Sequence, residues 1–351
     1  MNRSNTLIVL IFLAITLASY GQDSTSIEAK QVTKLFRSQE ILPLKLSYSH
    51  KNIKEKTKDS TFIQTELSYS EELGVWKTIP VELKTRGNYR LKNCYFPPVK
   101  MKMSKNDAKG TLFKGSRSLK LVMPCMLEKN KNDNIIKEYL AYKVYEIAGD
   151  YHFKVRLVSI DFAEERGNKT KEHDLKGILI EDPDDMAERY EGQILDRNFH
   201  PLAMDALSSV QNSFFQYLVG NTDFSTAVQH NEKLLFSDKK VIPVPYDFDM
   251  SGFVNTSYAV VSQIGDEQLD LYSVRERLYR GFKRDPSIIE GVRQNYLAHK
   301  MDIINVINSM ENQFEDKKSY DDTIRYVNDF FEVLSDDNKF KHEIIDHLRT
   351  K

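Results

Sequence analysis

Apolar and polar residues alternate along much of the first half of the chain. The alternation is strict in VKMKM, where Val99, Met101 and Met103 are expected to face a core and the lysines between them the opposite side. Other segments have the β-branched and aromatic composition typical of strands. They are LPLKLSYS (42–49), TFIQTELSYS (61–70), IPVELKTRG (79–87), SLKLVM (118–123), KVRLVSIDF (154–162) and KGILIED (176–182).

Helical spacing of apolar residues occurs once in this half and dominates the second. The segment 135–149 is expected to be a helix that begins at Asn132, Asp133 or Asn134 and stops at Gly149. A second helix is predicted from Met204 to Leu218, with Gly220 at the position of a C-terminal cap. Beyond Gly252 the chain is predicted to be mainly helical, including the basic stretch VRERLYRGFKR (274–284). We expect that stretch to be a solvated helix face, with binding of an acidic or phosphorylated partner as the alternative.

Between these helices, a short hairpin separates two groups of polar residues. KLLF (233–236) and VIPV (241–244) are predicted to pair around a turn at 237–240. Asp223 and Asn231 lie in the loop before this hairpin, and Asp247 and Asp249 follow it. The hairpin should therefore bring the two polar groups to the same place.

This set of groups suits phosphoryl transfer. One carboxylate, Asp223, can orient an attacking hydroxyl, while carboxylate and amide oxygens hold Mg²⁺ or Mn²⁺ against phosphates. Asp247, Asn231 and Asp249 are the candidate metal ligands. The segment FSTAVQH lengthens the loop before Asn231, so either it loops out or Gln229 or Asn221 replaces Asn231. An ordinary polar loop beside a hairpin is the simpler alternative, because Asn and Asp are common in turns.

The order of these motifs resembles the spore coat protein H-like (CotH-like) secreted kinases and, more distantly, the HipA-type kinases. The resemblance covers roughly residues 80–255 and rests on GNTD…HN and PVPYDFDMS, preceded by VELKTRGNYR, FPPVKMKM, SLKLVMP, KEYLAYKVYEIAG and KGILIEDPDDMAER. It implies an α+β, two-lobed protein-kinase-like fold. A β-rich nucleotide-binding lobe would span residues 22–182 and a mainly helical catalytic lobe residues 183–351.

The same resemblance implies how ATP would be held. Lys120 is the candidate for the phosphates, paired with Glu138 on the following helix, with Lys102 the second choice and Lys100 the third. The alternatives are that Lys120 is a solvated lysine on an edge strand and that Glu138 is a charge on the helix surface. Glu181 and its neighbours would read the adenine edge. TRGNYR (85–90) is expected to be either a structural hairpin turn or a cationic loop in which Arg86 approaches phosphate.

The first 21 residues have the pattern of a secretory signal peptide. Arg3 precedes the apolar run 7–19, and small residues stand before Gln22. No later segment is apolar enough to span a membrane, so we expect an exported protein, periplasmic or extracellular. In an oxidising compartment Cys94 and Cys125 either form a disulfide or remain two buried free thiols.

The balance of positive and negative charge gives no reason to expect nucleic acid as a partner. Lys and Arg number 50 and Asp and Glu 51, so no overall field favours nucleic acid. The sequence predicts an exported atypical ATP-dependent kinase that acts on a Ser or Thr hydroxyl of a secreted or envelope protein. The alternatives are a catalytically inactive binding or structural protein, and an enzyme that transfers AMP or acts on a glycan.

Overall fold

Seven strands from the first half of the chain close into a barrel. The computed structural model describes residues 32–56, 61–262 and 269–350. The signal peptide predicted at residues 1–21 lies outside these ranges. Going round the barrel, the strands are β1 (Leu42–Tyr48), β2 (Ile63–Glu72), β3 (Val75–Thr85), β4 (Val99–Lys102), β5 (Ser118–Val122), β7 (Lys169–Glu181) and β6 (Val155–Arg166). All neighbours are antiparallel except β1 and β6, whose parallel pairing from Leu42↔Val158 to Tyr48↔Glu164 closes the ring.

This architecture corrects the predicted fold class. The two-lobed protein-kinase-like fold with a β-rich N-terminal and a mainly helical C-terminal lobe is wrong, because the first half is a closed barrel. The second half also holds a three-stranded sheet in the order β10 (Lys240–Pro245), β9 (Glu232–Ser237) and β8 (Gln193–Leu195). Alternation of apolar residues predicts strands but not which sheet edges meet, so it did not reveal the closure.

The remaining elements are helices. The longer ones are α5 (Lys131–Ala148), α7 (Ala206–Leu218), α8 (Pro286–Ala298), α9 (Lys300–Asn308) and α10 (Lys317–Ser335). The shorter ones are α1 (Lys34–Arg37), α2 (His50–Lys56), α3 (Asn88–Asn93), α4 (Lys105–Ala108), α6 (Pro183–Arg189) and α11 (Asp337–Glu343). Short 3₁₀ helices occupy Pro201–Ala203, Glu311–Gln313 and Ile345–His347. Among the described residues, no helix is both long and apolar enough to cross a membrane.

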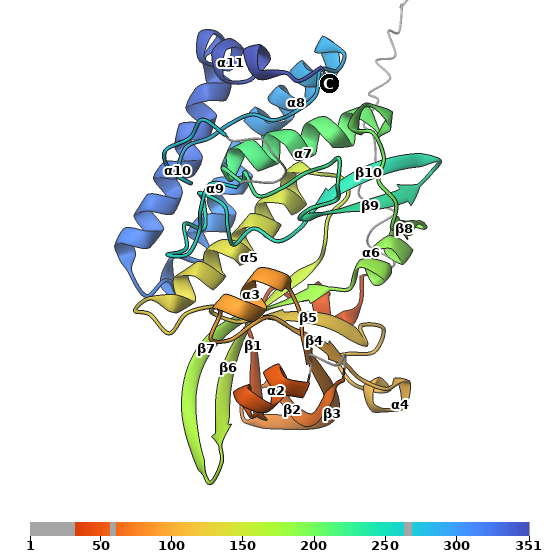
Figure 1. Cartoon of the computed structure of the whole chain (residues 1–351), viewed down its shortest axis with the longest axis vertical. Coiled ribbons are helices and arrows are strands. Elements are labelled where there is room, and N and C mark those ends of the chain that lie inside the picture. The colour runs from red at the N-terminus through yellow and green to blue at the C-terminus, as the bar shows by residue number, and fades with distance from the viewer. Residues whose placement is uncertain (1–31, 57–60, 263–268, 351) are drawn as a thin grey trace, which may run out of the picture. The chain divides into compact units, whose positions relative to one another are not determined.

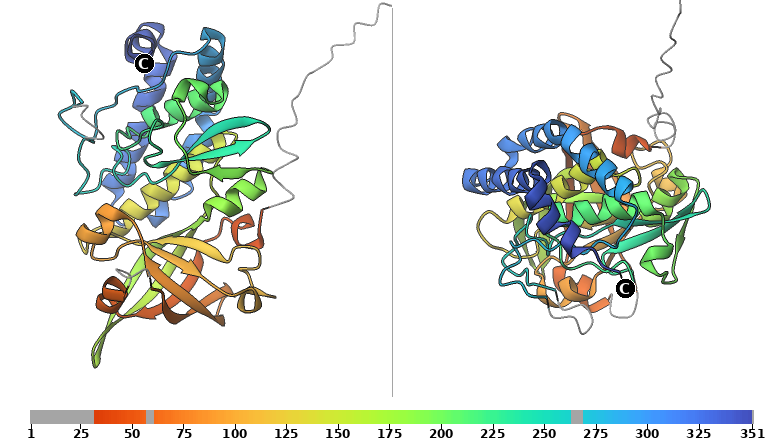
Figure 2. Two further views of the ribbon diagram at one scale, coloured as in Figure 1. Left: turned by 45° about the vertical axis from the view of Figure 1, so that its right-hand side comes forward. Right: turned by 90° about the horizontal axis from the view of Figure 1, so that it is seen from above.

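Two hydrophobic cores explain the arrangement. One fills the barrel, where the alternating residues Val99, Met101 and Met103 are buried as predicted. The other lies between the outside of β6 and β7 and the helices, and it includes Leu157 and Ile178. Residues 155–158 of β6 and 177–181 of β7 are thus buried on both faces. Helix α5 crosses between the barrel and the helices α7 and α9 (Figures 1 and 2).

Several predicted element boundaries are confirmed and one is wrong. Helix α7 ends at Leu218, and Gly220 follows with φ +57°, as the cap position required. The hairpin turns where it was predicted, with Ser237 facing Lys240. Helix α5 stops at Gly149 as expected, but its N-cap is Asn130 rather than the residues 132–134. Asn130 has a left-handed conformation, φ 58°, which the apolar spacing does not signal.

Candidate functional site

The loop between α7 and β9 carries Asp223 and Asn231. Ser225 and His230 exchange both of their backbone hydrogen bonds, at 3.0 Å each, so the intervening residues loop out as a small hairpin. The side-chain amide of Asn231 donates to the Oδ2 of Asp223 at 2.9 Å and to its backbone carbonyl at 2.6 Å. Both of these hydrogen bonds come from the amide nitrogen of Asn231, and its amide oxygen takes no part in them.

The two alternatives to Asn231 are used elsewhere. Gln229 donates to the carbonyl of Arg197 at 2.7 Å. Asn221 is buried; its Oδ1 accepts from the backbone N–H of Asp223 at 2.9 Å, and its amide donates to Gln216. Of the three candidate amides, Asn231 is the one that lies beside the Asp223 carboxylate.

Asp223 has two further side-chain partners, on its Oδ1. Ser262 donates to this oxygen at 3.1 Å, and the Nε2 of His230 lies 3.3 Å from it. The hydrogen bond to Asp223 raises the pKa of His230 against the opposing effect of burial. The Asp223 carboxylate is thus oriented by Asn231 and His230, from the far end of its own loop, and by Ser262.

Asp247 reaches the same place from the end of β10. The hairpin ladder continues one step beyond the strands, since the N–H of Tyr246 donates to the carbonyl of Asn231 at 3.0 Å. Asp247 itself has φ +66°, a conformation that non-glycine residues seldom adopt, and its N–H donates to the hydroxyl of Tyr142 on α5. Residues held in this way often mark functional positions.

Two cations hold the Asp247 carboxylate, one on each oxygen. Nζ of Lys120, from β5, lies 3.3 Å from Oδ2, and Nη2 of Arg90, from α3, lies 3.3 Å from Oδ1. Burial by itself would raise the pKa of Asp247, but Lys120, Arg90 and Arg86 together lower it well below the usual range. The carboxylate is therefore ionised at every pH at which the protein is expected to work.

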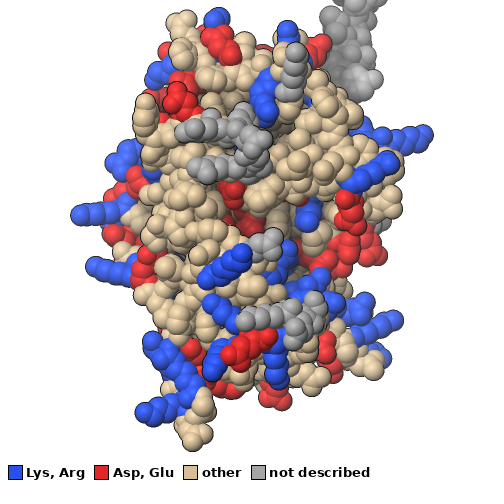
Figure 3. Space-filling view, in the orientation of Figure 1, with Lys and Arg blue, Asp and Glu red and all other residues tan. Residues whose placement is uncertain are grey.

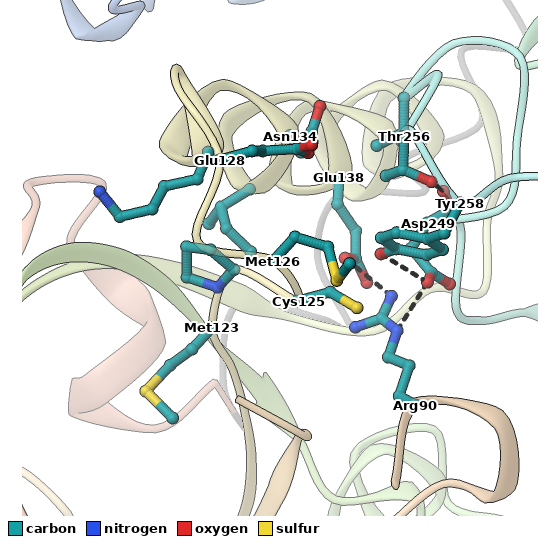
Figure 4. A pocket seen from close by; sticks show the side chains of 14 residues that line it. Arg90, Met123, Cys125, Met126, Glu128, Asn134, Glu138, Asp249, Thr256 and Tyr258 are labelled. Atoms are coloured by element: carbon teal, nitrogen blue, oxygen red, sulfur yellow. Dashed lines mark hydrogen bonds and ion pairs between the residues drawn. The ribbon is translucent and has the colours of Figure 1, made fainter. Parts of the chain in front are cut away.

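Arg90 is the centre of a larger ion cluster (Figure 4). Its Nε donates to Asp249 at 2.6 Å and its Nη2 to Glu138 at 3.1 Å, and its side chain is only 7% exposed. Asp249 also accepts from the hydroxyl of Tyr258 at 2.9 Å. Burial raises the pKa of Glu138 to about 7, although Arg90 opposes this.

The ion pair expected between Lys120 and Glu138 is not present. Lys120 pairs with Asp247, and Glu138 pairs with Arg90 instead. Glu138 is on α5 as predicted, but the chain places a guanidinium beside its carboxylate. Arg90 belongs to the TRGNYR motif, but no role of its own was predicted for it from the sequence. Glu138 and Asp249 are far from Arg90 in the sequence, so no local pattern indicates that the three side chains meet.

The groups line an open cavity of about 520 Å³. Its volume is within the range of small-molecule sites. The cavity collects six of the predicted site residues, namely Arg86, Lys120, Asp223, Asn231, Asp247 and Asp249. In the space-filling view, a recess near the centre of one face contains acidic atoms and is bordered by Lys and Arg side chains on the side of the barrel (Figure 3).

Three predicted residues do not line this cavity. Glu138 lies behind it, in the cluster around Arg90. Lys102 is exposed on β4, with its ammonium over the ring of Phe62. Glu181 is buried and paired with Arg189, and its N–H donates to the carbonyl of Lys154, so it does not offer a free edge to a nucleotide base.

TRGNYR is neither a hairpin turn nor a free loop. β3 ends at Thr85, Gly87 turns the chain with φ +82°, and α3 begins at residue 88. This geometry sends Arg86 towards the ring of Tyr246 and Arg90 towards the carboxylates. Both arginines therefore reach the cavity, in line with the cationic alternative.

The basic stretch 274–284 is not a helix, contrary to the prediction. Its arginines donate to backbone carbonyls instead of facing solvent: Arg277 to Leu218 at 3.2 Å, and Arg280 to Thr222 and Phe224 at 3.1 Å. These carbonyls belong to the end of α7 and to the loop around Asp223. Regular spacing of arginines thus resembled a helix face, while the stretch supports the site from behind.

Comparison with known proteins adds no assignment. The sequence matches no protein-family model, and no curated protein matches it significantly. In the part of the chain that the structure describes, no group of three or more His, Cys, Asp or Glu side chains is arranged to hold a metal ion.

Proposed function

We propose that this chain is an exported enzyme that transfers the terminal phosphoryl group of ATP to a hydroxyl group, with Mg²⁺ or Mn²⁺. The observation that carries the proposal is the composition of the cavity. Three cations, Arg86, Arg90 and Lys120, come from the barrel side and face the oxygen-bearing side chains Asp223, Asn231 and Asp247. Phosphoryl transfer requires positive charge for the phosphates and carboxylates for the metal and the nucleophile.

The donor set fits a hard divalent cation. Asp247 is an ionised carboxylate, 26% exposed, and Asn231 lies across the hairpin, where its backbone carbonyl accepts from the N–H of Tyr246. Such oxygen donors suit Mg²⁺ or Mn²⁺ and not zinc. Asp249 is less suited, because its Oδ2 already accepts from Arg90 and Tyr258. When bound, the cation would neutralise charge on the phosphates.

The remaining residues bind and orient the reactants. Lys120 and Arg86 attract the phosphates, and Lys120 can exchange its contact with Asp247 for one with a phosphate oxygen. Asp223 accepts the hydrogen bond of the acceptor hydroxyl and aligns it for attack. The acceptor is a Ser or Thr of a secreted or envelope protein, or a glycan hydroxyl. The disulfide between Cys94 and Cys125 supports the exported setting.

The first test compares Asp223→Asn with the wild type. This change keeps the size of the side chain and removes its charge. We expect turnover to fall by at least about 100-fold, in keeping with general-base contributions, with little change in ATP affinity. The matched control is Asp302→Asn, an exposed aspartate on α9 whose side chain is 61% exposed. Full phosphotransfer by Asp223→Asn would remove this residue from the catalytic role.

The second test concerns the metal. Asp247→Ala should abolish the dependence of nucleotide binding on Mn²⁺, measured by titration calorimetry with and without the ion. A folded Asp247→Ala protein with unchanged dependence would contradict the assignment. Mass spectrometry of the product distinguishes phosphate from AMP transfer, because the two add different masses.

One observation favours a second candidate, a binding protein without catalysis. Lys120 and Arg90 already neutralise Asp247, so the cluster is electrostatically complete as it stands. A thermal shift with ATP and Mn²⁺ tests this, since a specific ligand stabilises the folded state by mass action. Stabilisation without product formation on any hydroxyl acceptor would favour the binding protein.

A further inference from the structure

Arg90 lies on helix α3, which is too short to be stable by itself. Helix α3 has only 6 residues, and isolated helices shorter than about 12 residues are marginal in water. Yet Arg90 must be placed accurately, because its guanidinium contacts three carboxylates, Glu138, Asp247 and Asp249. Something outside the helix must therefore fix α3.

The disulfide supplies that anchor. Cys94 is the C-cap of α3 and is bonded to Cys125, which follows β5; their Cα atoms are 4.5 Å apart. The N–H of Tyr95 donates to the carbonyl of Cys125 at 2.8 Å. Lys54 from α2 donates to the carbonyl of Cys94 at 2.7 Å. The end of α3 is thus joined covalently to the segment just beyond the strand that carries Lys120.

Figure 4 shows the side chain of Cys125, one half of the disulfide, in the same pocket as Arg90. Cys125 lines the small recess behind the main cavity, together with Arg90, Glu138 and Asp249. The bond therefore lies beside the ion cluster and not at a distant surface. Cys94 is 1% and Cys125 6% exposed, so both are packed into the protein.

Arg90 contributes something to Asp247 that Lys120 cannot. The two cations contact different oxygens of the carboxylate, Oδ1 and Oδ2 respectively. The terminal torsion of an aspartate is broad and roughly two-fold, so one contact leaves the carboxylate free to turn. Two contacts, one on each oxygen, fix its plane.

We propose that Arg90 is a positioning residue for Asp247 and that the Cys94–Cys125 disulfide acts on the site through Arg90. The proposal deepens the proposed function and rests on it for its catalytic meaning. Without the bond, α3 loses its fixed end, the guanidinium loses its alignment with the carboxylates, and the segment 246–250 becomes more mobile.

The test is a double-mutant cycle. It compares the wild type, Arg90→Gln, the double variant Cys94→Ala/Cys125→Ala, and the combination of all three changes. Hydrogen exchange of the peptide 246–250 and the KM for Mn²⁺–ATP are measured well below the thermal midpoint of each protein. The control is Arg117→Gln, an exposed arginine outside the cavity.

We expect Arg90→Gln and the disulfide-free variant each to raise exchange in 246–250 by about tenfold, with a higher KM. Removing the disulfide from Arg90→Gln should then add nothing. Additive effects, or unchanged exchange in the disulfide-free protein, would overturn the proposal. Arg90→Lys should be intermediate, because an ammonium keeps the charge but cannot repeat the forked contacts.

A second variant covers the case in which the disulfide-free protein does not fold. One glycine inserted between Asn93 and Cys94 keeps the bond but uncouples α3 from it, and the same rise in exchange is expected. Hydrogen exchange does not depend on catalysis. Coupled changes in exchange in a protein that transfers no phosphate would therefore reject the proposed function and retain the positioning role.

Discussion

At the residue scale, the site is an assembly of ionisable groups that compensate one another. Asp247 remains charged because Lys120, Arg90 and Arg86 outweigh the effect of its burial. Glu138 has a single close cation, shared with two other carboxylates, and its pKa rises to about 7. Burial and nearby charge thus lower the pKa of Asp247 and raise that of Glu138, because Asp247 has more cations close to it than Glu138 has.

Glu232 gives a prediction on stability and pH. It is 1% exposed and lines the cavity, and its Oε1 accepts from Asn212 at 2.6 Å. Burial raises its pKa from 4.5 to about 7. Between these values the unfolded chain releases the proton and the folded chain keeps it, so the free energy of unfolding falls as pH rises.

The loss should reach up to about 3 kcal/mol above pH 7, at about 1.4 kcal/mol for each unit of pKa difference. Glu232→Gln carries no charge at any pH, so we expect it to remove this part of the pH dependence and to be more stable than the wild type at pH 8. Urea unfolding at pH 5, 6, 7 and 8 measures it. Parallel pH profiles for the two proteins would contradict the prediction.

At the element scale, the junction between α7 and the Asp223 loop depends on close backbone contacts. The N–H of Gly252 donates to the carbonyl of Gly220 at 3.0 Å, which joins the loop before Asp223 to the segment after Asp249. A Cβ on Gly220 would lie 2.0 Å from the hydroxyl of Tyr326, on α10. The junction therefore has no room for a side chain.

Gly220→Ala should lower the free energy of unfolding by about 2–4 kcal/mol, through its positive φ and the overlap with Tyr326. Tyr326→Phe removes the overlapping oxygen, which is buried and, in the described part of the chain, accepts and donates no hydrogen bond. It should therefore recover about 1–3 kcal/mol in the double variant and cost little alone. Denaturant melts of the four proteins give the coupling, and simple additivity would refute the steric explanation.

Elements with strong local signals were predictable. α7, its glycine stop and the β9–β10 hairpin follow from apolar spacing and turn residues, and with them the approach of Asp223, Asn231 and Asp247. Arg90 was not given a role, because its partners lie 48 to 159 residues away in the sequence. The stretch 274–284 was assigned wrongly because arginines that bind carbonyls have no distinct spacing.

At the scale of the whole molecule, the disulfide joins two segments that are separated in the sequence. Its formation confirms one of the two alternatives for Cys94 and Cys125, whose separation in sequence is 31 residues. Cys94→Ala/Cys125→Ala should lower the free energy of unfolding by roughly 3–4 kcal/mol on the chain-entropy model. Urea denaturation measures the difference.

A thiol assay on denatured, unreduced protein from the exporting host serves as the check on the bond itself, and it should detect no free thiol. Two titratable thiols would contradict the pairing.

The closure of the barrel, in contrast, had no counterpart in the sequence pattern. It depends on β1 meeting β6, and each strand taken alone looks the same whether the sheet is open or closed.

That closure also sets an order of events for the nascent chain. β1 can pair with β2 early, but its other edge must wait for β6, more than a hundred residues later. Such distant pairing is slow, and an open strand edge can meanwhile pair with another chain. β1 contains Pro43 and Lys45, residues that discourage foreign pairing at an edge. β1 thus contains residues that hinder its pairing with another chain until β6 is available to complete the barrel.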